Sequence, residues 1–133
     1  DFRREFGQFV VRNYGEWVNG GEDRPPLSTD LVPQFLAPLL GSNRHVLFVV
    51  IDCLRLDQWR TIMPIFLESF RMVEEDSFYS ILPTATQYSR NALFAGMMPL
   101  EIDKFYHAQW KNDDEEGGKN LFEEEFLKNK ENN

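Results

Sequence analysis

The sequence has 133 residues, a net charge of −8 and a single cysteine, Cys53. The acidic excess argues against a surface that binds duplex nucleic acid by displacing counterions. No apolar run reaches the roughly 18 residues of a membrane span, and no signal-peptide pattern is present. A lone cysteine cannot form an internal disulfide, which favours a reducing, cytoplasmic setting. The hydrophobic content of 42% allows one domain with a core.

Two helices are predicted within residues 1–44, and both are expected to be lead-in elements that pack on the following domain. The first is amphipathic, with apolar residues at helical spacing: Phe2, Phe6, Phe9, Val10 and Trp17. The second should begin after the capping residues 28–30 and end at Gly41. Pro33 suits its first turn, whereas Pro38 should bend it.

The middle of the chain predicts an α/β architecture. Residues 46–51 form a continuous apolar run, typical of a central strand in a mostly parallel sheet that helices flank on both sides. A helix is expected over 59–70, with Pro64 near its start. A short strand over 78–82 and a third helix that stops at Gly96 should follow.

The pattern weakens after residue 99. Phe105, Tyr106 and Trp110 suggest a small apolar cluster, residues 112–118 a solvated acidic loop, and residues 121–127 a last helix. The sequence begins inside a helical pattern and ends without a helix stop. We therefore expect a piece of a longer protein, with residues 45–133 forming the N-terminal part of a domain truncated at its C-terminus.

Asp52 and Thr86 are the candidate site residues. Asp52 follows the predicted strand, and ligands of open α/β sheets bind beyond the carboxyl ends of the strands. Its carboxylate could hold a divalent cation or cap the next turn. Thr86 stands where the third helix begins, and its hydroxyl could cap that helix or attack phosphorus beside a metal.

Three further residues compete for roles at this corner. Thr84 lies two residues before Thr86 and could take either of its roles. Arg90 and Asn91 lie about one turn into the helix, where either could reach a phosphate oxygen. Arg90 is equally consistent with a surface charge. Cys53 follows Asp52 and is predicted to be a core residue rather than a nucleophile.

Two motifs carry a resemblance. IDCLRLD, followed by LPTATQYSRNALFAGMMP, resembles the alkaline phosphatase superfamily, in which an Asp ends a strand and a Thr or Ser nucleophile opens a helix. Within that superfamily the sequence is most similar to PglZ-type domains, marked by Asp-x-x-Arg after the strand and Pro-x-x-Thr before the helix. The motifs cover residues 46–99.

The resemblance implies a zinc-dependent phosphodiesterase or phosphatase with two zinc ions. Asp52 would be a zinc ligand, and Thr86, rather than Thr84, would be the nucleophile and a ligand of the second metal. Arg55 follows Asp52 at the family spacing and would shape the site. Arg90 and Asn91, which the resemblance does not assign, stay candidate substrate-binding residues from their place in the helix. Attack by the threonine would give a phospho-threonine, which a metal-bound water then hydrolyses.

The family's other metal ligands are Asp and His residues downstream of the nucleophile, and this sequence departs from that pattern. Its histidines are His45, ahead of the predicted strand, and His107, four residues after Asp103 in an aromatic stretch. Neither matches the pattern. We therefore expect the 133 residues alone to be catalytically silent and to bind zinc weakly.

A narrower likeness, resting on Tyr106-His107 and the acidic segment 113–120, is to response regulators of the PorX type. In these a receiver domain precedes the PglZ domain. It implies type IX secretion as the regulated process and small or cyclic oligonucleotides as substrates. Signalling proteins are further expected partners, and the parent could form a homodimer. The competing hypothesis is an effector module that docks protein partners, with a structural or vestigial metal site.

Overall fold

The structure is a computed structural model, and it describes residues 1–41, 45–108 and 122–131. Its α-helices are α1 (Phe2–Val18), α2 (Ala37–Leu40), α3 (Leu56–Leu67), α4 (Thr86–Ala95), α5 (Pro99–Phe105) and α6 (Glu123–Glu131), with a 3₁₀ turn, η1 (Ser28–Asp30), and a π-helical segment, η2 (Leu31–Leu36). Among the described helices, none is both long and apolar enough to cross a membrane.

The predicted α/β sheet is wrong for the described residues, which contain helices and one isolated β-bridge. That bridge joins Leu27 and Tyr79 in parallel, through Ser28 N–H donating to Tyr79 O at 3.0 Å and Tyr79 N–H to Pro26 O at 2.9 Å. A strand exists only where a second backbone pairs with it along its length. Residues 46–51 have no such pairing and no regular secondary structure.

Although residues 46–51 are unpaired, their side chains alternate between half-buried and exposed, as they would in a strand. Phe48 lies edge-on to Phe94 of α4, with ring centroids 5.8 Å apart, and Val50 also packs against the core. Leu47 and Val49 point the other way and are 88% and 63% exposed. The apolar run therefore buries one face, and nothing in the described chain covers the other.

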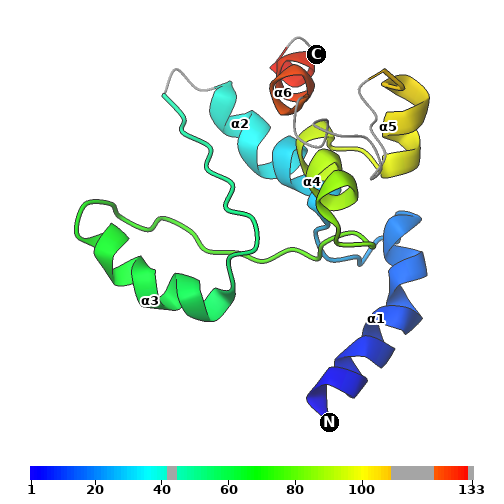
Figure 1. Cartoon of the computed structure of the whole chain (residues 1–133), viewed down its shortest axis with the longest axis horizontal. Coiled ribbons are helices and arrows are strands. Elements are labelled where there is room, and N and C mark those ends of the chain that lie inside the picture. The colour runs from blue at the N-terminus through cyan, green and yellow to red at the C-terminus, as the bar shows by residue number, and fades with distance from the viewer. Residues whose placement is uncertain (42–44, 109–121, 132–133) are drawn as a thin grey trace.

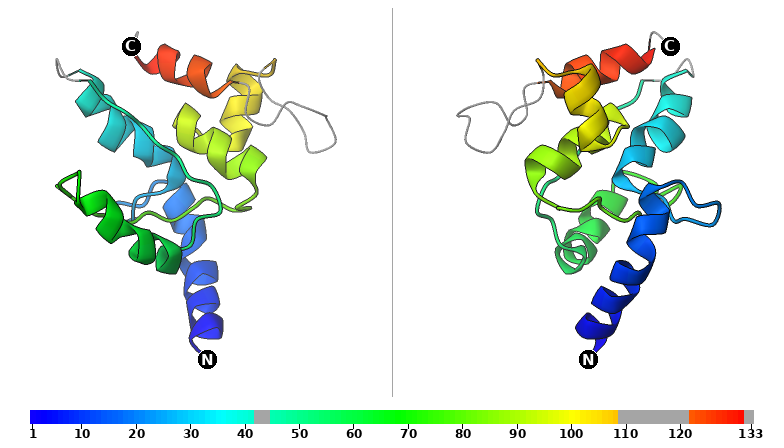
Figure 2. Two further views of the ribbon diagram at one scale, coloured as in Figure 1. Left: turned by 60° about the vertical axis from the view of Figure 1, so that its left-hand side comes forward. Right: turned by 90° about the vertical axis from the view of Figure 1, so that its right-hand side faces the viewer.

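Helix α4 lies at the centre of the core. Figure 1 shows α2, α5 and α6 gathered around it, with α3 and the N-terminal half of α1 projecting away, and Figure 2 confirms this arrangement from two further sides. The buried apolar residues come from α1, the loop before η1, η2, the loop before α4, α4 itself, α5 and α6: Trp17, Leu27, Val32, Leu36, Ile81, Ala92, Phe94, Ala95, Ile102 and Phe126. The core is thus assembled on one short helix.

The predicted first helix is confirmed as α1, and its C-terminal half holds it to the molecule. Trp17 is buried, its ring centroid 4.8 Å from that of Tyr79. The Leu82 N–H donates to the Tyr14 hydroxyl at 2.6 Å. Phe2, at the other end, is 80% exposed.

The predicted helix up to Gly41 is present but changes type along its length. Residues 31–36 are π-helical and α2 follows, with Pro38 near its first residue. Proline lacks the N–H that an uninterrupted α-helix would need there.

Helix α3 begins at Leu56, three residues earlier than predicted, so Pro64 lies inside it and not near its start. Helix α5 was not predicted, although Pro99 in its first turn and Glu101, which accepts from Met98 N–H at 2.9 Å, are start signals. Helix α6 overlaps the predicted last helix. Trp110, the predicted loop 112–118 and Leu121 lie outside the described residues.

Candidate functional site

Asp52 and Thr86 meet, although they are 34 residues apart in the chain. The Thr86 hydroxyl donates to Asp52 Oδ2 at 3.3 Å. The other carboxylate oxygen, Oδ1, accepts the Cys53 backbone N–H at 2.8 Å. Cys53 has a φ of 58°, in the left-handed region that residues other than glycine rarely occupy. The turn after residues 46–51 therefore directs the Asp52 carboxylate toward α4.

Thr86 is the first residue of α4 and does not cap it, because the N-cap is Ala85. Its hydroxyl is instead bonded to Asp52. The Ala85 carbonyl accepts the N–H groups of Tyr88 and Ser89, both at 3.0 Å, so the first turn of α4 is closed without the Thr86 side chain. Thr84 is exposed, and its carbonyl accepts from the Ser89 hydroxyl at 3.2 Å. The structure thus brings Thr86, and not Thr84, to Asp52.

Arg90 lies one turn after Thr86 on the same face of α4. Its Nη1 is 3.9 Å from Asp52 Oδ2, the oxygen that Thr86 also approaches. Its Nε and Nη2 donate to the two carboxylate oxygens of Glu123, and its Cζ lies 5.7 Å from the centroid of the Phe94 ring. Hydrogen bonding to Glu123, together with the negative charges of Glu123 and Asp52, raises the pKa of Arg90.

Two of the predicted substrate-binding residues have other partners. Arg55 Nε and Nη2 donate to Asp57 at 2.9 and 2.6 Å on the exposed start of α3. Asn91 is buried, and its amide donates to the Gln87 carbonyl at 2.9 Å inside α4. Cys53 is exposed, so the prediction that it belongs to the core is wrong. The assembled group is Asp52, Thr86 and Arg90.

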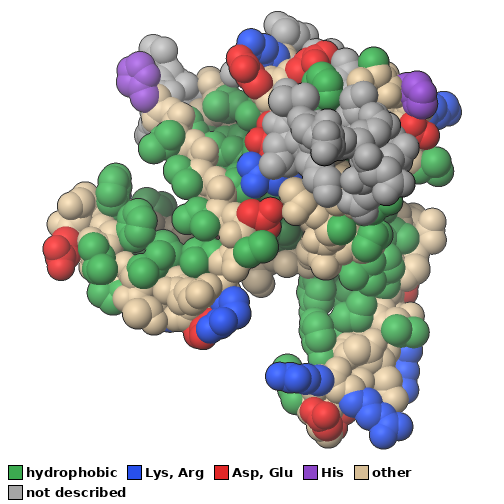
Figure 3. Space-filling model, in the orientation of Figure 1, with side chains coloured by type: hydrophobic (Ala, Val, Ile, Leu, Met, Phe, Trp, Pro, Cys, Tyr) green, Lys and Arg blue, Asp and Glu red, His purple; other side chains and the backbone are tan. Residues whose placement is uncertain are grey.

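The donor set near Asp52 is incomplete for zinc. Asp52 and Thr86 offer two oxygen atoms, whereas a protein zinc site has four ligands, of which three or four come from side chains. Within the described ranges, no group of three or more His, Cys, Asp or Glu residues is arranged to hold a metal ion. His107 Nδ1 lies 2.8 Å from Asp103 Oδ1. Figure 3 shows the histidine side chains at opposite sides of one face.

The three assembled side chains suit chemistry at a phosphate. A hydroxyl can act as a nucleophile when an adjacent group accepts its proton, and the Asp52 carboxylate is hydrogen-bonded to it. A guanidinium beside the same position can bind phosphoryl oxygens. The side chains of Asp52 and Arg90 are 48% and 21% exposed, so a ligand can reach the site from solvent.

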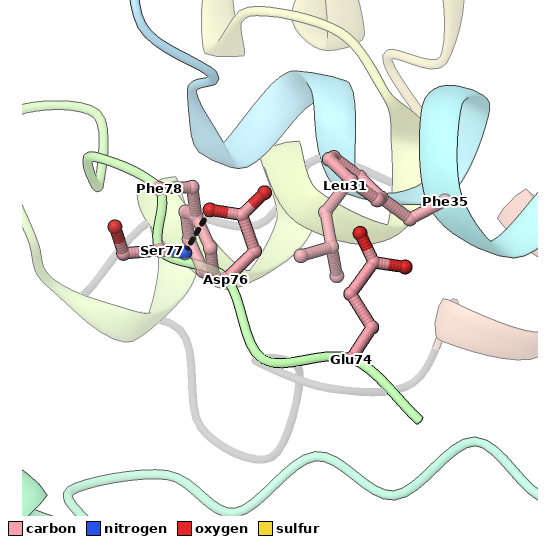
Figure 4. A pocket seen from close by; sticks show the side chains of 6 residues that line it. All are labelled: Leu31, Phe35, Glu74, Asp76, Ser77 and Phe78. Atoms are coloured by element: carbon pink, nitrogen blue, oxygen red, sulfur yellow. Dashed lines mark hydrogen bonds between the residues drawn. The ribbon is translucent and has the colours of Figure 1, made fainter. Parts of the chain in front are cut away.

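Separate from this site is a cavity of about 290 Å³ between η2 and the segment after α3. Figure 4 shows the side chains that line it: Leu31, Phe35, Glu74, Asp76, Ser77 and Phe78. Asp76 Oδ1 accepts the Ser77 N–H at 2.6 Å. No predicted site residue lines this cavity.

Glu123 binds Arg90 of the assembled group and was not identified from the sequence. It is the first residue of α6 and lies 33 positions after Arg90, the residue it binds. Local pattern offers one clue, because Glu123 stands three residues before the buried Phe126 and so shares its helix face. No local pattern identifies Arg90 as its partner.

Comparison with known families identifies a match over most of the chain. A family model described as the BREX system PglZ alkaline phosphatase-like domain matches residues 31–133. None of the curated proteins matches the chain.

Proposed function

The chain belongs to the PglZ family of alkaline phosphatase-like domains, and we propose that it carries the nucleophile of a phosphoesterase. The observation that supports this is the contact of the Thr86 hydroxyl with Asp52 at the start of α4. Family membership alone supports a phosphoesterase-type fold. The contact supplies the pair of groups that a phosphoryl transfer to threonine needs.

In the proposed reaction the Thr86 oxygen forms a bond to phosphorus as the bond from phosphorus to the leaving alcohol breaks. The hydroxyl proton passes to the Asp52 oxygen that accepts its hydrogen bond, and the leaving oxygen takes a proton from solvent. Water then hydrolyses the phospho-threonine and restores the hydroxyl. Arg90 binds the phosphoryl oxygens, with Asn91 and Arg55 as further proposed contacts from α4 and the start of α3.

Zinc is part of the proposal, with two ions expected in the complete domain and Asp52 and Thr86 among the ligands. The described residues do not complete such a site, so the remaining ligands must come from elsewhere in the protein. When bound, zinc would polarise phosphoryl oxygens and favour the ionised hydroxyl.

The test is hydrolysis of a chromogenic phosphodiester by the full-length protein that carries this sequence, with zinc and with chelator. Thr86→Val should lower turnover by a factor of about 10³ or more, because the nucleophile is lost. Its thermal unfolding should stay close to that of the wild type. Turnover should also depend on zinc.

Thr84→Val is the matched control, because it removes a hydroxyl two residues away that does not contact Asp52. It should leave turnover within about twofold of wild type. Equal losses in both variants, or full activity in Thr86→Val, would reject the assignment. A monoester and a short oligonucleotide should be tried alongside, since they separate phosphatase from diesterase.

The narrower proposal is that residues 45–133 are the N-terminal part of the catalytic domain of a cytoplasmic, PorX-type response regulator, with residues 1–44 packing on it. It carries with it small or cyclic oligonucleotide substrates, signalling partners, a homodimer and a link to type IX secretion. Its support is the sequence likeness around residues 106–120. Phosphorylation of a neighbouring receiver domain should then change the rate of hydrolysis.

The second candidate function is an effector module that docks protein partners. Exposed apolar side chains favour it, since contiguous apolar surface marks interaction sites. Figure 3 shows apolar side chains over α3 and the adjoining segment, and α3 buries none of its residues. This reading predicts that Thr86→Val leaves partner binding and signalling unchanged and that zinc-loaded wild type hydrolyses none of the three substrates.

A further inference from the structure

Glu123 is held in place by the packing of α6. Phe126, one turn later on the same face, is 2% exposed and meets Tyr106 edge-on with ring centroids 5.6 Å apart. This contact anchors α6 on the residue that ends α5, and Phe126 belongs to the same buried cluster as Phe94 of α4. A carboxylate in the first turn of a helix is also favoured by the helix dipole. Glu123 is therefore a fixed partner for Arg90 rather than a mobile surface charge.

The contact between Glu123 and Arg90 uses one edge of the guanidinium. Arginine has five N–H donors, one on Nε and two on each Nη. Glu123 accepts from Nε and Nη2. This leaves one Nη2 hydrogen and one Nη1 hydrogen on the Nη1–Nη2 edge, and a second Nη1 hydrogen on the side of Cδ. Nη1 is the nitrogen that lies 3.9 Å from Asp52. The Nη1 end of the guanidinium thus lies beside Asp52 Oδ2, the oxygen to which the Thr86 hydroxyl is hydrogen-bonded.

From this geometry we infer that Glu123 is a positioning residue, which holds Arg90 so that its Nη1–Nη2 edge binds a phosphoryl group beside Thr86. The inference rests on the proposed function and adds a residue to it. Two parallel N–H···O bonds from one guanidinium edge are the usual way in which arginine binds phosphate. The Phe94 ring supports the same guanidinium from the side.

Without Glu123, Arg90 would keep its charge but lose its orientation. It could then turn to Asp52, whose carboxylate lies nearby, and the ion pair would compete with substrate. Phosphate oxygens contact Arg90 in the ground state and in the transition state alike. The loss should therefore raise KM and weaken phosphate binding more than it lowers kcat.

The experiment measures phosphodiester hydrolysis, inhibition by inorganic phosphate, and equilibrium binding of inorganic phosphate to the full-length protein. Glu123→Ala should raise KM and the phosphate dissociation constant by about tenfold, the lower end of what losing an orienting partner costs at metal sites. Glu123→Gln should give a KM and a phosphate dissociation constant between those of wild type and Glu123→Ala. It replaces the alanine variant in the test if that variant fails to fold. Arg90→Ala combined with Glu123→Ala should be no worse than Arg90→Ala.

Glu124→Ala is the matched control, because Glu124 is the next residue of α6 and pairs with Lys128 in solvent at 2.6 Å. It should leave all three measurements unchanged. Wild-type affinity in a folded Glu123→Ala or Glu123→Gln protein would overturn the inference. So would an equal effect in the Arg90→Ala background, or tighter phosphate binding, which would make Glu123 a competitor of the anion.

The phosphate-binding measurement separates this inference from the proposed function. If wild type binds phosphate but hydrolyses nothing, the proposed function fails. A Glu123 effect that passes through Arg90 would then still uphold the positioning role at an anion site. If wild type binds no phosphate, the inference is overturned whatever the turnover.

Discussion

The Asp30 carboxylate accepts three hydrogen bonds at the junction between α1 and η2. Two come from the Arg24 guanidinium and one from the Leu27 backbone N–H, the latter at 2.8 Å. The side chain of Asp30 is 10% exposed. Hydrogen bonding to Arg24 lowers the pKa of Asp30, against the opposing effect of burial, and the Leu27 N–H adds to it.

The ion pair between Arg24 and Asp30 predicts that the free energy of unfolding depends on pH. A carboxyl whose pKa is lowered by folding stabilises the protein above its unfolded pKa of about 3.9 and loses that contribution as pH falls through the folded value. Asp30→Asn should cost about 1–3 kcal/mol at pH 7, because the half-buried Arg24 loses its charged partner. Urea unfolding of wild type and variant between pH 7 and 2.5 measures both effects.

Wild-type stability should fall toward that of Asp30→Asn as the pH drops below about 4. Arg24→Met is the complementary variant, and its unfolding free energy should lose the same acid-sensitive component. A constant difference between wild type and Asp30→Asn across the whole range would show that the charge of Asp30 contributes nothing.

At the scale of elements, α4 carries both the core and the candidate site, so its C-terminus is a sensitive point. Gly96 ends the helix with a φ of 61°. A Cβ built there would lie 2.9 Å from Pro33 Cγ and 3.4 Å from the Thr29 carbonyl oxygen. Glycine is thus required by backbone conformation and by the close approach of the segment 29–33.

Gly96→Ala should destabilise the protein by about 1–2 kcal/mol from the left-handed conformation alone, with the contact to Pro33 adding to it. Gly15→Ala is the control, since it lies inside α1 with no neighbouring atom within 4 Å and should gain about 0.5–1 kcal/mol. Chemical denaturation of both variants gives the comparison. Similar changes in both would mean that the end of α4 tolerates a side chain.

The sheet prediction failed because residues 46–51 have no neighbouring strand among the described residues to pair with. Residues 46–51 have the composition of a central strand, but composition does not supply a neighbouring backbone. Tyr79 finds its bridge partner in Leu27, a loop residue, and not in the apolar run. Phe48 packs on Phe94 of α4 and Val50 packs against the core, so the segment keeps a strand's periodicity without belonging to a sheet.

At the scale of the whole molecule, the described residues supply too few ligands for a zinc site. Asp52 and Thr86 are two oxygen donors, and no described cluster adds three or more ligating side chains. A four-ligand site is therefore not closed by these parts of the chain. We expect the 133 residues alone to bind zinc weakly and to be catalytically silent.

Calorimetric titration of zinc into the isolated chain should show no tight stoichiometric complex, and zinc should leave its thermal unfolding unchanged. Thr86→Val should titrate like wild type. A tight complex of defined stoichiometry would contradict the prediction and would direct the search for ligands to residues outside the described ranges.

The sequence alone determined the helical periodicity of α1 and the end of α4 at Gly96, because these depend on residues three or four apart. It also placed Asp52 after an apolar run and Thr86 at a helix start, in motifs whose family the match over residues 31–133 confirms. Their chemical roles stay predictions. The resemblance had already favoured Thr86 over Thr84. Only the tertiary structure showed that the Thr86 hydroxyl contacts Asp52 and that Glu123 pairs with Arg90. Contacts across more than 30 residues depend on how α4 and α6 pack, which no local spacing encodes.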